Sequence, residues 1–166
     1  MGLECGLFGT TAAGSEAGVS GGLALALVYR AERFAVSGSG RAGGIGSGEK
    51  QLGLASLDVG ARYYLSSSEI APFIGGGFLL GYYDLGRERG TSVDGSGVGS
   101  FVHAGVEVLR THHTTFSISA RADLPFFALA SEVPAYDYSY GQGKTTYALE
   151  TRYIVPLSLN VGVLFH

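Results

Sequence analysis

The stretch YIVPLSLNVGVLFH, residues 153–166, alternates between two kinds of side chain. Every second residue is apolar, and the residues between them are smaller or more polar on balance. The apolar row consists of Tyr153, Val155, Leu157, Leu159, Val161, Val163 and Phe165. Because successive side chains of a strand point to opposite faces, this pattern predicts a strand with one apolar face. That face must contact either a protein core or lipid.

The same period of two residues recurs along most of the chain, whereas helical spacing is hard to find. Gly is abundant, with 28 of 166 residues, and Gly disfavours helices. We predict eight strands, each of about 10 residues or more, which is long enough to cross a bilayer at a tilt. They cover residues 2–12, 18–30, 33–46, 50–65, 69–83, 98–110, 114–128 and 144–165.

The connections between these strands alternate in length. Three are tight, namely residues 30–33, 66–69 and 111–114. Four are longer or richer in Gly and Ser, namely residues 13–18, 43–50, 84–97 and 130–143. This alternation is typical of an antiparallel up-and-down barrel in the bacterial outer membrane, which has short periplasmic turns and longer external loops. Eight strands would place both termini on the periplasmic side.

The two faces of the predicted strands differ in charge. If the apolar rows face outward, the inward rows carry five acidic residues and five arginines. These are Glu4, Arg33, Arg41, Asp58, Arg62, Glu107, Arg121, Asp123, Glu150 and Arg152. Charges inside a narrow barrel are costly to bury unless they are paired. Equal numbers of both signs therefore predict a network of ion pairs that fills the lumen, and an apolar face that contacts lipid.

Aromatic residues lie near both ends of the predicted strands, as expected for rings of amphipathic side chains at the two membrane interfaces. Those near the short turns are Tyr29, Phe34, Tyr63, Phe116 and Phe165. Those near the long loops are Phe8, Tyr82, Tyr83, Phe126, Phe127 and Tyr147. Two aromatic rings would fix the depth of the barrel in a bilayer.

Composition excludes several classes of function. Charged residues make up only 15% of the chain and the formal charge is −3, so we expect no nucleic-acid partner. Cys5 is the single cysteine, which excludes an intramolecular disulfide and a cysteine-based metal cluster. The chain contains no run of 18 apolar residues, so no membrane helix is predicted. The first residues do not resemble a signal peptide. We expect one domain, residues 1–166.

No cofactor or metal is expected. Residues 38–43 read GSGRAG and match the letters of the dinucleotide-binding fingerprint. That fingerprint requires a helix after the glycines, to bind the phosphates with its N-terminus. Here the pattern predicts a strand instead.

Two short motifs resemble those of the small eight-stranded outer-membrane barrels of the OmpA and OmpX kind. PFIGGG, residues 72–77, is similar to a Pro-aromatic-aliphatic-Gly stretch common in that group. Asn160, Gly162 and Phe165 match the C-terminal signal that the barrel-assembly machinery reads, although His166 follows the aromatic residue. The resemblance implies an outer-membrane barrel that contacts outer-membrane lipid, with that machinery as a partner during insertion.

This scaffold carries many activities, so the fold does not select one. We expect a non-enzymatic structural, anchoring or interaction protein, alone or as a subunit of a larger envelope complex. Its partners would contact the loops 84–97 and 130–143, and the second loop contains Tyr136, Tyr138 and Tyr140. Tyrosines among Ser and Gly residues suit protein or glycan contacts.

Two alternatives remain open. The first is a lipid A-modifying barrel enzyme, a deacylase or acyltransferase, in which His103 and Glu107 lie four residues apart on one strand face. Acyl transfer also needs a nucleophile beside the histidine, and Gly105 occupies the position where a serine would help. The second alternative is a soluble, lipocalin-like ligand carrier, whose apolar rows would face inward.

Overall fold

The computed structural model describes residues 1–13, 20–46, 52–86, 92–137 and 144–166. Within these residues the chain forms strands only in the order β1 (Gly2–Ala13), β2 (Ser20–Arg30), β3 (Phe34–Gly46), β4 (Leu52–Tyr64), β5 (Ile70–Gly86), β6 (Ser92–Val108), β7 (Thr114–Pro125), β8 (Leu129–Asp137), β9 (Lys144–Arg152) and β10 (Val155–Phe165). No helix in the described ranges has the length and apolar character needed to cross a membrane.

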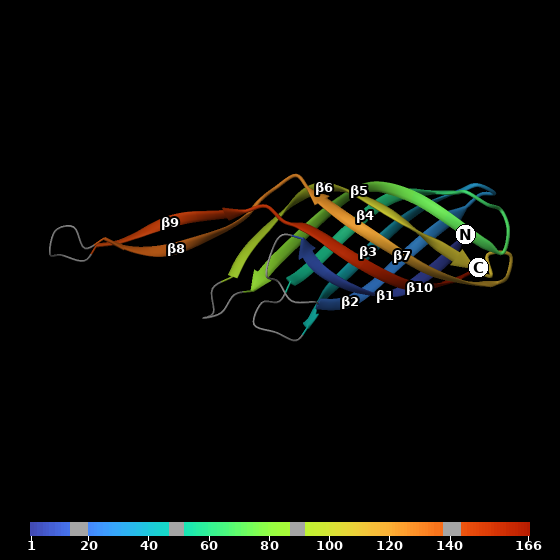
Figure 1. Ribbon diagram of the computed structural model, residues 1–166, viewed down its shortest axis with the longest axis horizontal. Helices are drawn as coiled ribbons and strands as arrows, with labels where there is room; N and C mark the ends of the chain where they lie inside the picture. The colour runs from blue at the N-terminus through green and yellow to red at the C-terminus, as the bar shows by residue number, and fades with distance from the viewer. Residues whose placement is uncertain (14–19, 47–51, 87–91, 138–143) are drawn as a thin grey trace.

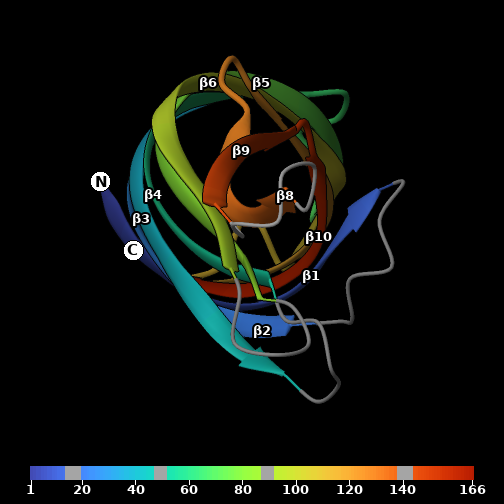
Figure 2. The ribbon, with the colours of Figure 1, turned by 90° about the vertical axis from the view of Figure 1, so that its left-hand side faces the viewer.

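Eight of these strands form a closed antiparallel barrel. Each strand from β1 to β6 pairs with the next one in the chain, and β10 pairs with both β7 and β1. Figure 2 shows the resulting ring of strands. This confirms the predicted up-and-down fold.

The barrel has two distinct ends (Figure 1). Both termini lie at one end, beside the short connections at residues 31–33, 65–69 and 109–113. We call this the turn end and the opposite one the loop end. At the turn end, the first connection is closed by a hydrogen bond from the Ala31 amide to the Phe34 carbonyl, at 2.8 Å.

A β-hairpin extends from the loop end, away from the barrel (Figure 1). β8 and β9 pair with each other from Leu129↔Arg152 to Asp137↔Lys144. Their described pairing to the barrel is a single bridge between Ala130 and Asp94 in β6. The hairpin therefore stands outside the hydrogen bonding that closes the barrel.

This hairpin corrects the predicted last strand. The sequence predicted one strand at 144–165 after a loop at 130–143, whereas the structure has β8, β9 and β10, with a break at residues 153–154. A strand of 22 residues would be about twice as long as a bilayer crossing requires. Alternation continues through residues 144–152, but the pattern does not distinguish a barrel strand from a hairpin strand.

The apolar rows face outward, as predicted. In β10, Leu157, Leu159 and Val161 are 42%, 59% and 51% exposed, whereas Ser158 between them is 5% exposed. Large apolar side chains are exposed in the same way around the barrel, including Leu7, Leu23, Leu25, Leu27, Leu57, Val59, Ile74, Phe78, Leu80, Val98, Val102 and Ile118. A surface of this kind belongs in lipid rather than water.

The lumen is apolar at both ends. The loop-end layer consists of Phe8, Ala12, Leu52, Leu54, Tyr83, Leu85, Val93, Leu129 and Ile154. The turn-end layer consists of Val28, Ala35, Tyr64, Ala71, Phe73 and Leu164. Inward-facing apolar residues thus cover the lumen where it would otherwise meet solvent.

Three aromatic residues do not lie where the interface rings were predicted. One of them, Phe127, is half-buried and packs against the loop-end layer and the Tyr83 ring. Phe8 and Tyr83 were expected near the membrane surface, but both are buried in the lumen, because they occupy inward positions of β1 and β5. Tyr29, Phe34, Tyr63, Phe116 and Phe165 are exposed near the turn end, and Tyr82 and Phe126 near the loop end. The side chain of Tyr147 lies outside the described part of the chain.

We expect lipid contact to alternate along β10. In protein reconstituted into bilayers, a spin label placed singly at residues 157–162 should contact lipid at odd positions and be shielded at even positions. Lipid-soluble and water-soluble relaxation agents measure this contact, in a background where the native thiol of Cys5 is removed. Lipid contact at the even positions would show that the barrel wall is inverted.

Candidate functional site

Eight charged side chains lie in the middle of the lumen, between the two apolar layers. In the described residues they form two separate clusters, one toward each end. Seven of the ten inward charges predicted from the sequence pair directly here with a partner of opposite sign. The eighth, Arg30, was not predicted.

The turn-end cluster consists of Glu4, Arg30, Arg62, Tyr64 and Glu107. Glu107 is 0% exposed and accepts hydrogen bonds from Arg30 at 2.7 Å, Arg62 at 3.2 Å and Tyr64 at 2.8 Å. The other terminal nitrogen of Arg62 donates to Glu4 at 2.7 Å. Arg62 therefore bridges two carboxylates that stand on different strands.

The loop-end cluster consists of Arg41, Asp58, Tyr83, Arg121 and Asp123. Arg121 donates to Asp58 at 2.8 Å and to Asp123. Arg41 donates to the same Asp123 at 3.1 Å, and the Tyr83 hydroxyl does so at 3.2 Å. Each cluster thus combines two arginines, two carboxylates and one tyrosine, and is neutral as a unit.

Each arginine of the clusters also lies against an aromatic ring. The distances from the guanidinium carbon to the ring centre are 5.9 Å for Arg30 and Tyr64, 4.5 Å for Arg41 and Phe8, 5.3 Å for Arg62 and Phe73, and 3.8 Å for Arg121 and Phe101. A flat guanidinium can stack on a ring while its edge binds carboxylates, whereas a lysine ammonium offers only a point charge. This explains why arginine is the basic residue in the lumen.

His103 joins the two clusters through aromatic contacts. Its ring lies edge-on to Phe73 and to Phe101, with 5.4 Å between ring centres in both cases. A Cβ atom at Gly75 would collide with His103 Nε2 and with the Ala61 carbonyl. Gly75, within the PFIGGG stretch, therefore leaves the space that the histidine occupies.

Three of the predicted lumen residues are placed elsewhere. Arg33 lies in the connection between β2 and β3 and is exposed, because the chain reverses direction before β3 begins. Arg152 ends β9 outside the barrel and is also exposed. Glu150 belongs to β9, and its side chain is outside the described part of the chain. All three were assigned to the lumen only because their neighbours alternate.

Arg30 could have been found from the same alternation. It follows Ala26 and Val28 on the inward row of β2, and Val28 is buried. The sequence interpretation placed it in a turn because it is the last residue before the reversal. Its long side chain reaches from the end of the strand back to Glu107.

The structure does not bring His103 and Glu107 together as a catalytic pair. Among the described contacts, Glu107 accepts its hydrogen bonds from Arg30, Arg62 and Tyr64, and His103 contacts aromatic rings. A carboxylate that orients a histidine must hydrogen-bond to it. The lipid A-modifying alternative therefore loses the His103–Glu107 pair on which it was based.

The other predicted site residues lie at the two ends of the molecule. Tyr136 is part of β8, while Tyr138 and Tyr140 lie outside the described residues. In β10, Asn160 donates weakly to Ser119 at 3.4–3.5 Å, Gly162 is buried, and Phe165 is 51% exposed. The role of these three as an assembly signal stays a prediction.

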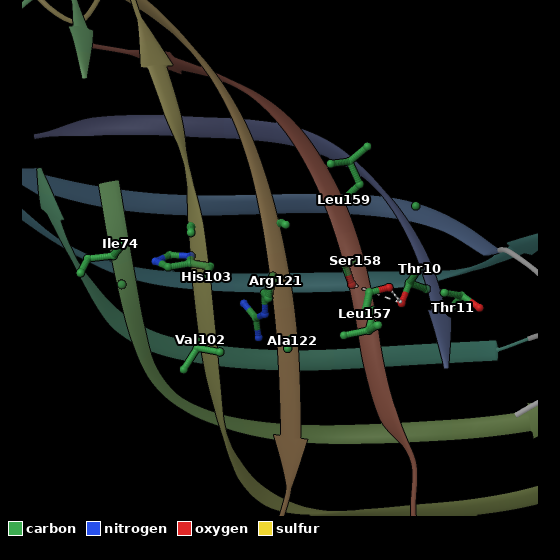
Figure 3. A pocket seen from close by; sticks show the side chains of 14 residues that line it. Thr10, Thr11, Ile74, Val102, His103, Arg121, Ala122, Leu157, Ser158 and Leu159 are labelled. Atoms are coloured by element: carbon green, nitrogen blue, oxygen red, sulfur yellow. Dashed lines mark hydrogen bonds between the residues drawn. The ribbon is translucent and has the colours of Figure 1, made fainter. Parts of the chain in front are cut away.

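The outer wall carries a shallow apolar depression of about 900 Å³ over β5, β6, β7, β10 and β1. Figure 3 shows the side chains around it, with Ile74, Val102, Leu157 and Leu159 at its borders. Ala104, Ala120 and Ala122 make the wall thin between these larger residues. Because it lies on the outward face, this depression is separate from the charged lumen.

Comparison with known proteins identifies the fold. No protein-family model matches the sequence, and no curated protein matches it. Neisserial surface protein A has a TM-score of 0.61 at 14% identity, with 99% of this chain and 94% of that chain covered. The outer membrane protein OprG of Pseudomonas aeruginosa has a TM-score of 0.60 at 14% identity, with 99% and 95% covered. The chain therefore has the fold of the small eight-stranded outer-membrane barrels.

The same fold also carries an enzyme. The outer membrane enzyme PagL has a TM-score of 0.53 at 12% identity, with 96% of this chain and 97% of that chain covered. At such low identity the likeness concerns the fold alone. Function must be argued from the residues of this chain.

Removing a lumen arginine should destabilise the barrel strongly. Arg121→Leu would leave Asp58 without its ion-pair partner, which costs about 3–5 kcal/mol when one member of a buried pair is lost. Arg33→Leu is the matched control, because an exposed charge contributes close to nothing. Urea unfolding in detergent measures both variants. Equal midpoints would contradict the assignment of the clusters as the main polar stabilisation of the lumen.

Proposed function

We propose that this protein is an integral barrel of the bacterial outer membrane, with a closed lumen and a non-enzymatic structural, anchoring or interaction role. In this proposal it acts alone or as a subunit of a larger envelope complex. The observation that carries the proposal is the filling of the lumen by two neutral ion-pair clusters between two apolar layers.

The membrane location is supported by the outer wall. Its exposed residues are apolar around the whole barrel, and aromatic side chains lie near both ends. These features match the apolar band and aromatic rings of outer-membrane barrels. A soluble ligand carrier would have the reverse distribution, so that alternative does not fit.

The orientation follows from the two ends of the barrel. Short turns lie on the periplasmic side of such barrels and longer extensions on the outside. Both termini lie at the turn end (Figure 1), which we place in the periplasm. The C-terminal strand then presents Asn160, Gly162 and Phe165 for recognition by the barrel-assembly machinery before insertion.

A closed lumen argues against transport as the function. Eight strands leave an interior just wide enough for side chains, and the lumen of this barrel holds the eight charged residues and their aromatic partners. A solute could pass only if several buried ion pairs broke together. Function is therefore expected on the surface of the barrel rather than through it.

The β8–β9 hairpin is the surface we assign to a partner. It extends from the loop end and forms one described bridge to the barrel. Apart from this bridge, β8 and β9 pair only with each other in the described residues, so the backbone groups on their outer edges are available to a partner. An isolated two-stranded hairpin is marginally stable in water, and contact with an envelope protein would stabilise it. The predicted loop 84–97 is shorter than expected, because residues 84–86 belong to β5 and residues 92–97 to β6. Asp94, in this part of β6, forms the bridge to the hairpin.

We expect no stable conductance from the purified protein. In planar bilayers the closed lumen should give only brief, small events, because ions cannot pass the buried clusters without breaking them. A porin reconstituted in the same lipid serves as the positive control. A large, long-lived and ion-selective conductance would contradict the closed lumen.

Replacing the hairpin should remove partner binding and spare the barrel. In this variant a two-residue Asn-Gly turn joins Ala130 to Thr151 in place of residues 131–150. Heat-modifiable gel migration should remain, since the pairing that closes the barrel does not use these residues. Crosslinking in intact cells should lose the bands that the full chain gives.

A control variant carries an unrelated β-hairpin of equal length in the same place. It should also lose these bands, because the proposal assigns binding to the β8–β9 sequence rather than to its bulk. Identical crosslinks from all three proteins would place the partner surface elsewhere on the barrel.

A further inference from the structure

A small polar cavity lies in the lumen between the two charged clusters. Its volume is about 70 Å³, which is enough for a few occupants the size of a water molecule. Its polar wall includes Ser39, Ser117, Ser119 and Asn160. Small residues such as Gly6 and Ala24 leave the space open on the side of β1 and β2.

The wall of this cavity is positively charged. Arg41 and Arg62 line it together with Arg121, whereas Glu4 is the one carboxylate in the described lining. Three positive charges and one negative charge leave a local excess of two positive charges. Asp58 stands directly behind this lining, where its Oδ2 accepts hydrogen bonds from Ser39 and Arg121. Glu107 and Asp123 also pair with the lining arginines without lining the cavity. The clusters are therefore neutral overall, and the excess positive charge belongs to the lining alone.

Each of these arginines also has a spare donor. Arg41 Nε, Arg62 Nε and Arg121 Nη2 are buried and have no hydrogen-bond partner within the described part of the chain. The side chains of Arg41 and Arg121 are only 3% and 7% exposed. A buried donor without a partner is costly, which favours an electron-rich occupant beside them. One buried carboxylate oxygen, Asp58 Oδ1, also has no hydrogen-bond partner in the described residues, but Asp58 does not line the cavity.

We propose that this cavity binds one small monovalent anion of the halide class, such as chloride, together with water. Guanidinium N–H groups and the amide of Asn160 can donate to it, and the excess positive charge of the wall compensates its charge. The size of the cavity excludes large organic anions. A metal cation is disfavoured by the three arginines.

Closure of the lumen determines how the anion enters. The apolar layers cover both ends of the lumen, so exchange with solvent through the finished barrel is slow. The anion is therefore captured while the barrel closes. The salt present during folding, rather than the salt added afterwards, decides whether the site is filled.

The test compares protein refolded in sodium chloride with protein refolded in sodium gluconate at equal ionic strength. Gluconate is too large for the cavity. The midpoint of heat-modifiable gel migration should be about 5 °C higher after refolding in chloride, because a ligand that binds only the folded state stabilises it. Crystals of protein refolded in bromide should show an anomalous peak between Arg41, Arg62 and Arg121.

Two variants separate binding in the cavity from a general salt effect. Ala24→Leu fills the cavity and should abolish the difference between the salts, whereas Ala55→Leu, on the exposed outer wall, should preserve it. A difference that persists in Ala24→Leu would overturn the proposal. If Ala24→Leu does not fold, the bromide crystal decides, and water alone at the cavity would overturn it.

Discussion

Eight charged side chains are buried inside this barrel, and their mutual compensation is the constraint on which the rest of the structure depends. Each arginine contacts at least one carboxylate, and the carboxylates come from strands that are far apart in sequence. Displacing one strand by a single residue would turn its charge outward and leave its partner buried alone. The ion pairs therefore define the register of the barrel as well as its polarity.

Aromatic residues let these charges fit into a narrow lumen. Phe8, Phe73 and Phe101 each cover the face of one arginine, and Tyr64 lies against Arg30 as well as Arg110. The guanidinium edges of the cluster arginines are thus left free for carboxylates. Gly60 and Gly75 supply the matching space, since a Cβ at Gly60 would lie 2.6 Å from the Phe101 ring. Large and small inward residues thus alternate between neighbouring strands, as close packing requires.

The sequence predicted the barrel because one physical signal, the period of two residues, applies to most of the eight barrel strands. The same signal assigned the inward charges that form the clusters. It failed where alternation continues without a barrel, as at Arg152 in the β8–β9 hairpin, and where a strand ends, as at Arg30 and Arg33. Local pattern shows which face a residue occupies but not where the chain leaves the barrel wall, because that depends on pairing between distant strands.

Pairing partners across the cavity could not be predicted for a similar reason. That Arg62 would bridge Glu4 and Glu107, rather than Asp58 on its own strand, depends on the tilt of the strands and on the shift between them around the ring. No single strand contains this information. His103 illustrates the same limit, because its position between two rings follows from the pairing of β5 with β6 rather than from its neighbours in sequence.

The pairing of β1 with β10 closes the barrel, and we expect it to form last during folding. Strands β1 to β7 can form hairpins with their neighbours in sequence, but the seam between β1 and β10 joins Leu3 to Phe165. Contacts between such distant residues form slowly, because a long loop must be closed first. Until that step, Glu4 stands on an open edge strand, and its hydrogen bond from Ser117 on the far side of the seam is absent. The last polar contacts of the lumen are thus made only when the two ends of the chain meet, and the intermediate before closure carries an unpaired edge on either side.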